Sequence, residues 1–116
     1  ALIQTITIND SIFGQYKKNS DYIRHYIFPG GMLPSKTEFC LRANKAHLEV
    51  GKIFEFGHDY AWTLREWKKN FMVIKEDLIN ANYPLSFLKL WEFYLSMSIA
   101  GFESGRTNVL QIELIN

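Results

Sequence analysis

The two ends of the chain constrain its fold most, because both are predicted to be buried strands. Residues 2–8 are apolar and β-branched with no turn residue before them, and residues 107–115 have the same character. Strands at both ends with helical segments between them predict an α/β layer structure with a mainly parallel sheet. A strand with nothing before it usually pairs with a segment that is missing. We therefore expect both ends of the chain to be cut from a larger domain.

Three helices and one further strand are expected between the end strands. Ser35 and Glu38 have the spacing of a capping box, in which each side chain bonds the backbone N–H of the other residue. Apolar residues then recur every three or four positions through two longer segments, as on the buried face of a helix. The expected helices begin at Ser35, Asp59 and Pro84; the second ends near Ala81 and the third at Gly101 or Gly105.

The remaining segments have less regular patterns. Residues 47–56 are predicted to form a strand whose Leu48, Val50, Phe54 and Phe56 alternate inward. Residues 9–26 are predicted to be a loop with one or two short helical pieces. Two prolines and two glycines within residues 27–34 exclude regular structure there, although half of that segment is apolar. Such a loop either packs against the core or lines a pocket.

Composition excludes several classes of protein. A hydrophobic content of 47% is too high for a disordered tail, and no apolar run approaches the roughly 20 residues of a membrane-spanning helix. Thirteen basic and twelve acidic residues leave a net charge of +1, which is no footprint for nucleic acid. One cysteine excludes an internal disulfide. Aromatic residues make up 16% of the chain, which indicates either a large core or an apolar ligand.

Few residues carry an obvious chemistry. The chain has no Gly-x-Gly-x-x-Gly and no P-loop, and its three histidines lack the spacing of metal ligands, so we expect no metal site. Cys40 follows a core-facing residue of a helix and is expected to be a small buried thiol. Tyr60, at the start of the longest helix, remains. It is either the first core residue of that helix or a functional residue beside the apolar loop.

Four segments together resemble one family. The first is Tyr22-Ile-Arg-His-Tyr-Ile-Phe-Pro-Gly-Gly-Met-Leu-Pro-Ser35, and the second is Phe56-Gly-His-Asp-Tyr-Ala-Trp-Thr-Leu-Arg-Glu-Trp67. The third joins Trp91-Glu-Phe-Tyr-Leu to the end of the chain, and the fourth is the strand of residues 2–8. In their order along the chain they resemble the cyclopropane-fatty-acyl-phospholipid synthases, the family that includes the mycolic acid cyclopropane synthases. The resemblance covers essentially the whole chain.

The resemblance implies a fold and a place within it. The family has the Rossmann-like sheet of S-adenosylmethionine-dependent methyltransferases, and residues 1–116 would form the C-terminal fragment of that catalytic domain. They would hold strands five to seven, the last of them antiparallel, together with helices. The family's glycine-rich cofactor loop, acidic ribose ligand and catalytic Glu and Cys would lie upstream. We therefore expect the chain alone to lack the S-adenosylmethionine site and to be inactive.

The resemblance also implies a reaction and site residues. The complete enzyme would add a methylene across a cis double bond of an unsaturated phospholipid acyl chain, with bound bicarbonate accepting the proton. Bicarbonate would be held by the side chain of Gln4, the backbone of Ile6 and the hydroxyl of Tyr60. The acyl-chain pocket would use Phe28, Leu33, Tyr60 and Leu64. Gln4 stands where several family members have His; its amide can donate to bicarbonate but does not titrate near neutral pH.

Two functions stay open at this level. The first is the cyclopropane synthase-type methyltransferase, which we expect to be cytoplasmic and peripheral to a membrane, with no nucleic-acid partner. The second is a non-catalytic module that binds an acyl chain or a partner through the loop of residues 27–34. In either case three strands leave at least one sheet edge open, so we expect the isolated chain to self-associate through that edge or to hide it by rearrangement.

Overall fold

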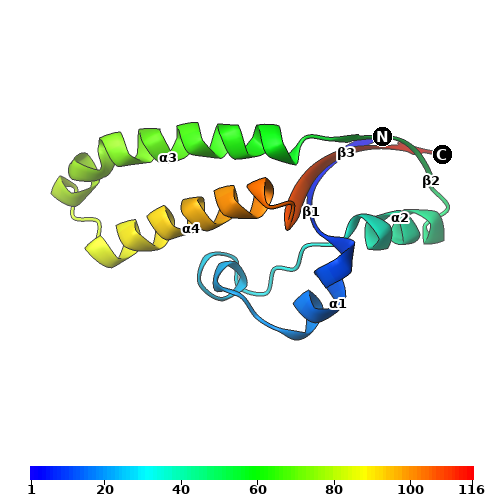
Figure 1. Cartoon of the computed structure of the whole chain (residues 1–116), viewed down its shortest axis with the longest axis horizontal. Helices are drawn as coiled ribbons and strands as arrows, with labels where there is room; N and C mark the ends of the chain where they lie inside the picture. The colour runs from blue at the N-terminus through cyan, green and yellow to red at the C-terminus, as the bar shows by residue number, and fades with distance from the viewer.

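The computed structural model describes all 116 residues as a curved three-stranded sheet from which a long helical hairpin extends (Figure 1). The strands are β1 (Leu2–Ile8), β2 (Glu49–Glu55) and β3 (Thr107–Ile115), in the order β1-β3-β2. Both pairings are antiparallel. The α/β class and the antiparallel last strand are confirmed. The expectation of mainly parallel pairing is wrong for these strands, because β3 returns after the hairpin and enters between the other two.

The sheet carries a separate hydrophobic cluster on each face. Side chains of β3 alternate between the faces, as the two-residue period of a strand requires. Val109 faces the hairpin of α3 (Gly57–Asn80) and α4 (Leu85–Glu103) and packs with Ala61, Leu64, Leu95 and Phe102. Leu110, Ile112 and Leu114 face the other way and pack with Ala43 of α2 (Lys36–Lys45). Helices therefore cover both faces of the sheet, as in other α/β layer structures.

The alternation expected for β2 is wrong at Phe54. The pairing of β2 with β3 shifts register between Val50 and Ile53, and both of these residues pack against the cluster on the α2 face. This irregularity reverses the phase of the strand, as a β-bulge does. Phe54 is consequently turned out and 61% exposed, with its ring stacked on that of Phe56 at 5.5 Å between centroids.

Residues 9–26 are more helical than expected. They contain α1 (Asp10–Lys18) and most of η1 (Ile23–Ile27), a single π-helical turn that ends one residue into the segment expected to be irregular. Asn9 caps α1, since its Oδ1 accepts from the Ser11 N–H at 2.9 Å. An acidic first turn and two lysines in the last turn complement the helix dipole. Residues 28–34, after η1, are irregular, as the prolines and glycines predict.

The next helix, α2 (Lys36–Lys45), begins as predicted, with half of the capping box formed. The Ser35 hydroxyl accepts from the Glu38 N–H at 3.1 Å. The Glu38 carboxylate does not return to Ser35; it accepts from Arg42 Nε at 2.7 Å instead. An arginine one turn along offers this carboxylate a charged donor, which is a stronger partner than a neutral backbone N–H.

The longest elements are α3 (Gly57–Asn80) and α4 (Leu85–Glu103), which form the hairpin. The predicted N-cap at Asp59 is wrong: α3 begins two residues earlier, and Asp59 lies in its first turn. Of the two predicted ends of α4, the later one is confirmed. Gly101 lies inside the helix, and Gly105 follows it with a φ of 75° that favours glycine.

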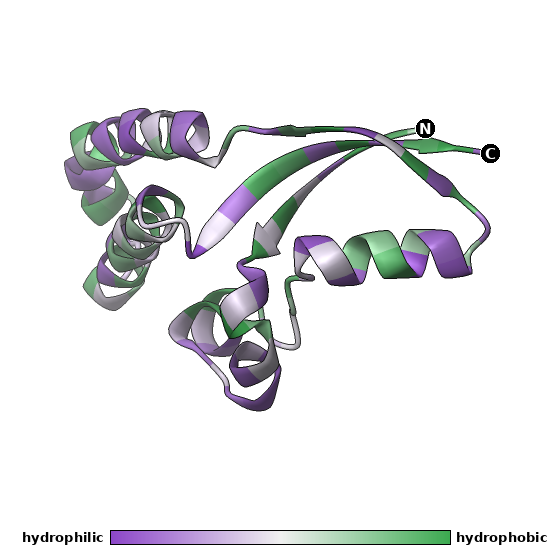
Figure 2. Ribbon diagram, turned by 45° about the vertical axis from the view of Figure 1, so that its right-hand side comes forward, coloured by the Kyte–Doolittle hydropathy of each residue, from purple (hydrophilic) through white to green (hydrophobic).

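The hairpin makes the molecule elongated. Its extents are 52 × 28 × 24 Å and its radius of gyration is 16.6 Å, against about 13 Å for a compact domain of 100 residues. Figure 2 shows α2 beneath the strands and the hairpin extending away from them. Large hydrophobic side chains remain exposed on the hairpin, among them Trp62, Val73 and Phe93. None of the helices is long and apolar enough to cross a membrane.

Candidate functional site

Three of the predicted site residues meet at the cluster between the hairpin and the sheet. Leu64 of α3 is a buried member of this cluster, and Ile6 of β1 and Tyr60 of α3 pack against it half-buried. Tyr60 and Leu64 are one helical turn apart and therefore share a face of α3. The structure thus brings together one residue of the first strand and two of the longest helix, which are more than 50 residues apart in the sequence.

The position of Tyr60 depends on how α3 begins. Asn108 of β3 accepts the Gly57 N–H on its Oδ1 at 2.8 Å and donates to the Glu55 carboxylate at 2.8 Å. A Cβ on Gly57 would lie 2.4 Å from Asn108 Oδ1, so only glycine allows this approach. The first turn of α3 is therefore fixed to the central strand, and Tyr60, whose N–H donates to the Phe56 carbonyl, follows from it.

The ring of Tyr60 lies among aromatic side chains of both hairpin helices. It meets Phe102 of α4 edge-on at 5.0 Å between centroids, and Trp67 of α3 edge-on at 5.9 Å. Edge-to-face pairs at such distances are favourable and orient the rings. The ring is therefore held on two sides within the cluster.

A second tyrosine lies beside Tyr60. Burial raises the pKa of the Tyr94 hydroxyl above its ordinary value of 10.0; a hydrogen bond with Ser98 opposes the rise, and the nearby Tyr60 adds to it. Tyr94 also meets the Phe28 ring edge-on at 6.1 Å. Tyr94 and Tyr60 both pack against the hairpin cluster, so Phe28 of the irregular loop meets that cluster through Tyr94. Sequence reasoning missed Tyr94 as a site residue, although it lies within the third family-like motif.

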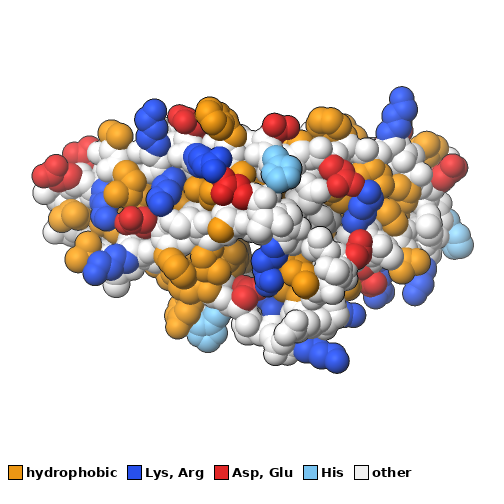
Figure 3. Space-filling view, in the orientation of Figure 1, with side chains coloured by type: hydrophobic (Ala, Val, Ile, Leu, Met, Phe, Trp, Pro, Cys, Tyr) orange, Lys and Arg blue, Asp and Glu red, His pale blue; other side chains and the backbone are white.

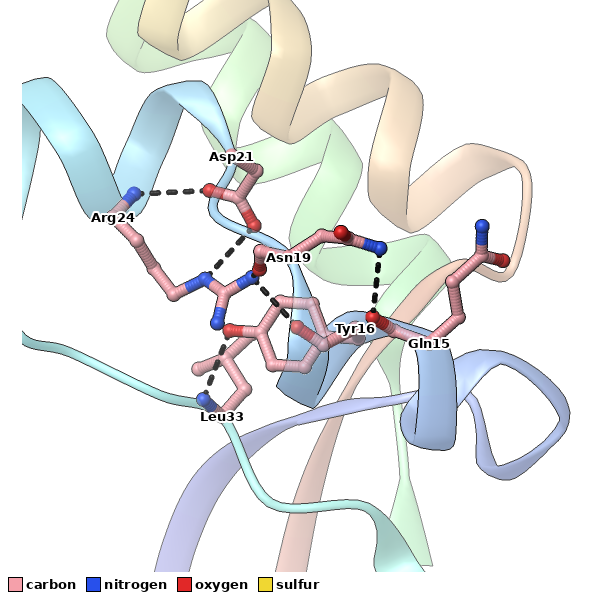
Figure 4. A network of polar contacts seen from close by, with 6 residues as sticks. All are labelled: Gln15, Tyr16, Asn19, Asp21, Arg24 and Leu33. Atoms are coloured by element: carbon pink, nitrogen blue, oxygen red, sulfur yellow. Dashed lines mark hydrogen bonds and ion pairs between the residues drawn. The ribbon is translucent and has the colours of Figure 1, made fainter.

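The loop that carries Phe28 is tied to α1 and η1 by a polar network (Figure 4). The guanidinium of Arg24 donates to the carbonyls of Tyr16 and Asn19 and pairs with the Asp21 carboxylate at 3.3 Å. It also lies over the Tyr16 ring at 4.0 Å. A planar guanidinium suits several acceptors and an aromatic face at once. Arg24 therefore joins the end of α1 to the start of η1.

Leu33 is fixed by the same network. Its backbone N–H donates to the hydroxyl of the buried Tyr16 at 3.0 Å. The far end of the loop continues into Ser35, which forms a parallel bridge with Ile8. The irregular loop is therefore anchored at both ends. Phe28 itself is 53% exposed, so its ring lies at the rim of the aromatic group.

Gln4 lies apart from the cluster but on the same face of the sheet as Ile6. Its Oε1 accepts from Gln111 Nε2 of β3 at 3.0 Å, which leaves the Gln4 amide nitrogen as a donor. In an antiparallel pair, alternate residues direct their backbone groups away from the partner strand. The Asn9 N–H donates to the carbonyl of Arg106, just before β3, whereas the Ile8 N–H donates to the Pro34 carbonyl on the other side. The same alternation directs the Ile6 N–H to the open edge of β1.

The arrangement therefore offers hydrogen-bond donors next to an aromatic surface. The Gln4 amide, the Ile6 N–H and the Tyr60 hydroxyl can each donate to an anion. The rings of Tyr60, Tyr94 and Phe28 present π faces that attract positive charge. Each of these groups has the chemistry to donate to a small oxyanion such as bicarbonate.

A family model described as mycolic acid cyclopropane synthetase matches residues 1–112. The chain belongs to this family. The family resemblance of the four sequence motifs is thereby confirmed. Tuberculostearic acid methyltransferase UfaA1 of Mycobacterium tuberculosis is 36% identical to this chain over 115 residues, which are 97% of this chain and 27% of that protein. The cyclopropane-fatty-acyl-phospholipid synthase of Escherichia coli is 28% identical over 91 residues, 78% of this chain and 23% of its own length.

Solved structures of the cyclopropane synthase family share the fold. Mycolic acid cyclopropane synthase CmaA1, solved in complex with SAH and CTAB, superposes with a TM-score of 0.86 at 25% identity. Cyclopropane synthase MmaA2 from Mycobacterium tuberculosis gives the same TM-score at 23% identity. Each match covers 99% of this chain and 43% of the other. The chain thus spans less than half of these structures and about a quarter of the two curated relatives described above.

Proposed function

We propose that this chain is the C-terminal part of an S-adenosylmethionine-dependent enzyme that adds one carbon across a double bond of an unsaturated phospholipid acyl chain. The observation that carries the proposal is the meeting of Ile6, Tyr60 and Leu64 at one cluster, with Phe28 connected through Tyr94. The names of the similar proteins, a cyclopropane-fatty-acyl-phospholipid synthase and a fatty-acid methyltransferase among them, agree with this chemistry.

In the proposed mechanism this chain binds the acyl substrate and the proton acceptor. Phe28, Leu33, Tyr60 and Leu64 line one side of the acyl chain and exclude water from it. The aromatic rings stabilise the positive charge that develops on the acyl chain as its double bond reacts, because a π face attracts a cation most strongly in a dry site.

Proton removal depends on the donors around Tyr60. The Tyr60 hydroxyl, the Gln4 amide and the Ile6 N–H would hold a bicarbonate ion beside the reacting carbon. Each is a donor that an anion requires, and Gln4 keeps its NH₂ group available because its oxygen accepts from Gln111. S-adenosylmethionine, when bound, supplies the electrophilic methyl group. This chain contains no glycine-rich loop of the Gly-x-Gly-x-x-Gly type, so we assign cofactor binding to the part of the longer protein that precedes β1.

The same proposal implies a location for the protein and partners for its open strand edges. A phospholipid substrate places the enzyme at a membrane surface, as a peripheral and cytoplasmic protein without a spanning helix of its own here. β1 and β2 are both outer strands with open edges. We propose that preceding strands of the longer protein pair with β1, and that the chain alone self-associates through these edges and is inactive.

The direct test is a methyl-transfer assay on the longer protein that contains this chain. The protein is incubated with methyl-labelled S-adenosylmethionine and vesicles of an unsaturated phospholipid, and the acyl chains are analysed by mass spectrometry. We expect the label in the acyl chain, with loss of the double bond. Saturated phospholipid vesicles are the matched control and should remain unlabelled. Unlabelled acyl chains with both lipids, together with intact binding of the unsaturated lipid, would instead favour the non-catalytic acyl-binding module.

A further inference from the structure

A groove of about 500 Å³ lies between α3 and α4, and it shares Ile99 with the cluster against which Tyr60 packs. Arg65, Lys68 and Lys69 line it from α3, at a spacing that places all three on one helix face. Glu103 is the single carboxylate in its lining, so the groove has an excess of two positive charges. Figure 3 shows Lys and Arg side chains over α3 and along its boundary with α4, with Asp and Glu side chains among them.

Two of the three cations are free to bind a further anion. Arg65 is paired with Glu103. Lys68 Nζ donates to the neutral Ser96 hydroxyl at 2.9 Å, and Lys69 Nζ has only a distant contact, 3.9 Å, with Glu66. Neither lysine therefore has a carboxylate at charge-assisted hydrogen-bond distance. Lys75, further along α3, differs from them, because it is paired with Glu92 at 2.9 Å.

The groove also has apolar walls. Met72 and Ile99 line it beside the lysines, and Met72 is 42% exposed. Val73, the next residue of α3, is 75% exposed. A soluble anion would gain nothing from these side chains. A lipid offers a phosphate to the lysines and an apolar chain to the neighbouring surface, so both features of the groove would have a partner.

We propose that this groove binds the phosphate of an anionic phospholipid headgroup at the membrane surface, through Lys68 and Lys69. The choice of a lipid rests on the proposed function. Lys68 is eight residues after Tyr60 on the same straight helix, which is about 12 Å at 1.5 Å per residue. The headgroup would thus be held on the hairpin, two turns from the proposed acyl site.

The test is binding of the longer protein to vesicles, without any cofactor. Vesicles of phosphatidylcholine with phosphatidylglycerol are compared with pure phosphatidylcholine by co-sedimentation. The test variant is Lys68→Gln/Lys69→Gln. The matched control, Lys17→Gln/Lys18→Gln, removes the same charge from the exposed end of α1. At about 1 kcal/mol for each lysine at an anionic surface, the dissociation constant of the test variant should rise roughly 30-fold on anionic vesicles. Binding of the control variant should fall by no more than a few-fold.

Three outcomes would overturn the proposal. Equal losses of vesicle binding in both variants would show a general effect of net charge. Unchanged vesicle binding of the test variant would show that the groove does not contact the lipid. If calorimetry shows that the groove binds inorganic phosphate while the test variant binds vesicles normally, the groove is a site for a free anion. Thermal melts of both variants establish that they fold. Because no methyl transfer is measured, this result is independent of the fate of the proposed reaction.

Discussion

At the scale of single residues, a side chain far away in sequence decides where the proposed site forms. The sequence pattern placed the cap of the longest helix at Asp59, which is the nearest suitable side chain. The structure uses Asn108, 51 residues after Gly57. Tyr60 and Leu64 could be predicted because their helical spacing and a family motif coincide. Asn108 and Tyr94 could not, because their contacts exist only after β3 and α4 have folded back onto α3.

Asn108→Ala should destabilise the chain by about 1 kcal/mol, since it removes the acceptor of the Gly57 N–H at the start of α3. Denaturant unfolding followed by circular dichroism measures the change. Asn70→Ala is the matched control, because Asn70 lies on the exposed surface of the same helix. It should leave the free energy of unfolding unchanged or raise it slightly. An equal decrease in the free energy of unfolding of the two variants would show that Asn108 does not position α3.

At the scale of elements, local signals predicted the helix starts better than they predicted strand phase. The Ser35 cap was visible in four consecutive residues and is confirmed. The faces to which the side chains of β2 point could not be seen in this way, because the register shift between Val50 and Ile53 is set by pairing with β3. The helix α1 was underestimated for a similar reason. Gly14 and the polar residues weaken its pattern, whereas its buried Tyr16 contacts the distant Leu33.

The stability that the junction of α1 and α2 contributes should depend on pH. A hydrogen bond with Ser35, together with weaker ones with Thr37, holds the pKa of Asp10 below its ordinary value of 3.8, although burial opposes this shift. A lowered carboxyl pKa means that the stabilisation is complete above pH 3.8 and is lost as the pH falls through the lower value of the folded state. Asp10→Asn should therefore be less stable than wild type at neutral pH, by on the order of 0.5 kcal/mol for so exposed a group.

Denaturant unfolding across the acid range measures this difference. The gap between wild type and Asp10→Asn should close below pH 3.8. In a Ser35→Ala background, which lacks the hydroxyl partner, Asp10→Asn should have a smaller pH-dependent effect. A gap that stays constant with pH, or that is the same in both backgrounds, would contradict the coupling of Asp10 to Ser35.

At the scale of the whole molecule, the order of the strands could not be predicted from the pattern of strands and helices along the chain. Alternating strands and helices suggested parallel pairing, and only the family resemblance implied that the last strand is antiparallel. The insertion of β3 between β1 and β2 has a consequence for the proposed site. β3 brings Gln111 beside Gln4 and Val109 beside Ile6, while Asn108 fixes the start of α3. One central strand thus organises every part of the site except the irregular loop.

We propose that Tyr60 holds the anion that accepts the proton, and the variant Tyr60→Phe in the longer protein tests this role. Phe keeps the ring packing on Phe102 and removes one charge-assisted hydrogen bond, worth about 1.5–3 kcal/mol. The rate of methyl transfer should fall on the order of tenfold to a hundredfold at low bicarbonate. Added bicarbonate should partly restore it.

Leu64→Ala, one turn along the same face of α3, is the control for packing. It should weaken handling of the acyl chain and show no response to bicarbonate. The measurement is the rate of methyl transfer of wild type and both variants across bicarbonate concentrations, with thermal stability determined alongside. We expect added bicarbonate to rescue Tyr60→Phe alone. A Tyr60→Phe enzyme as active as wild type at low bicarbonate would contradict this expectation and make Tyr60 a core residue of α3.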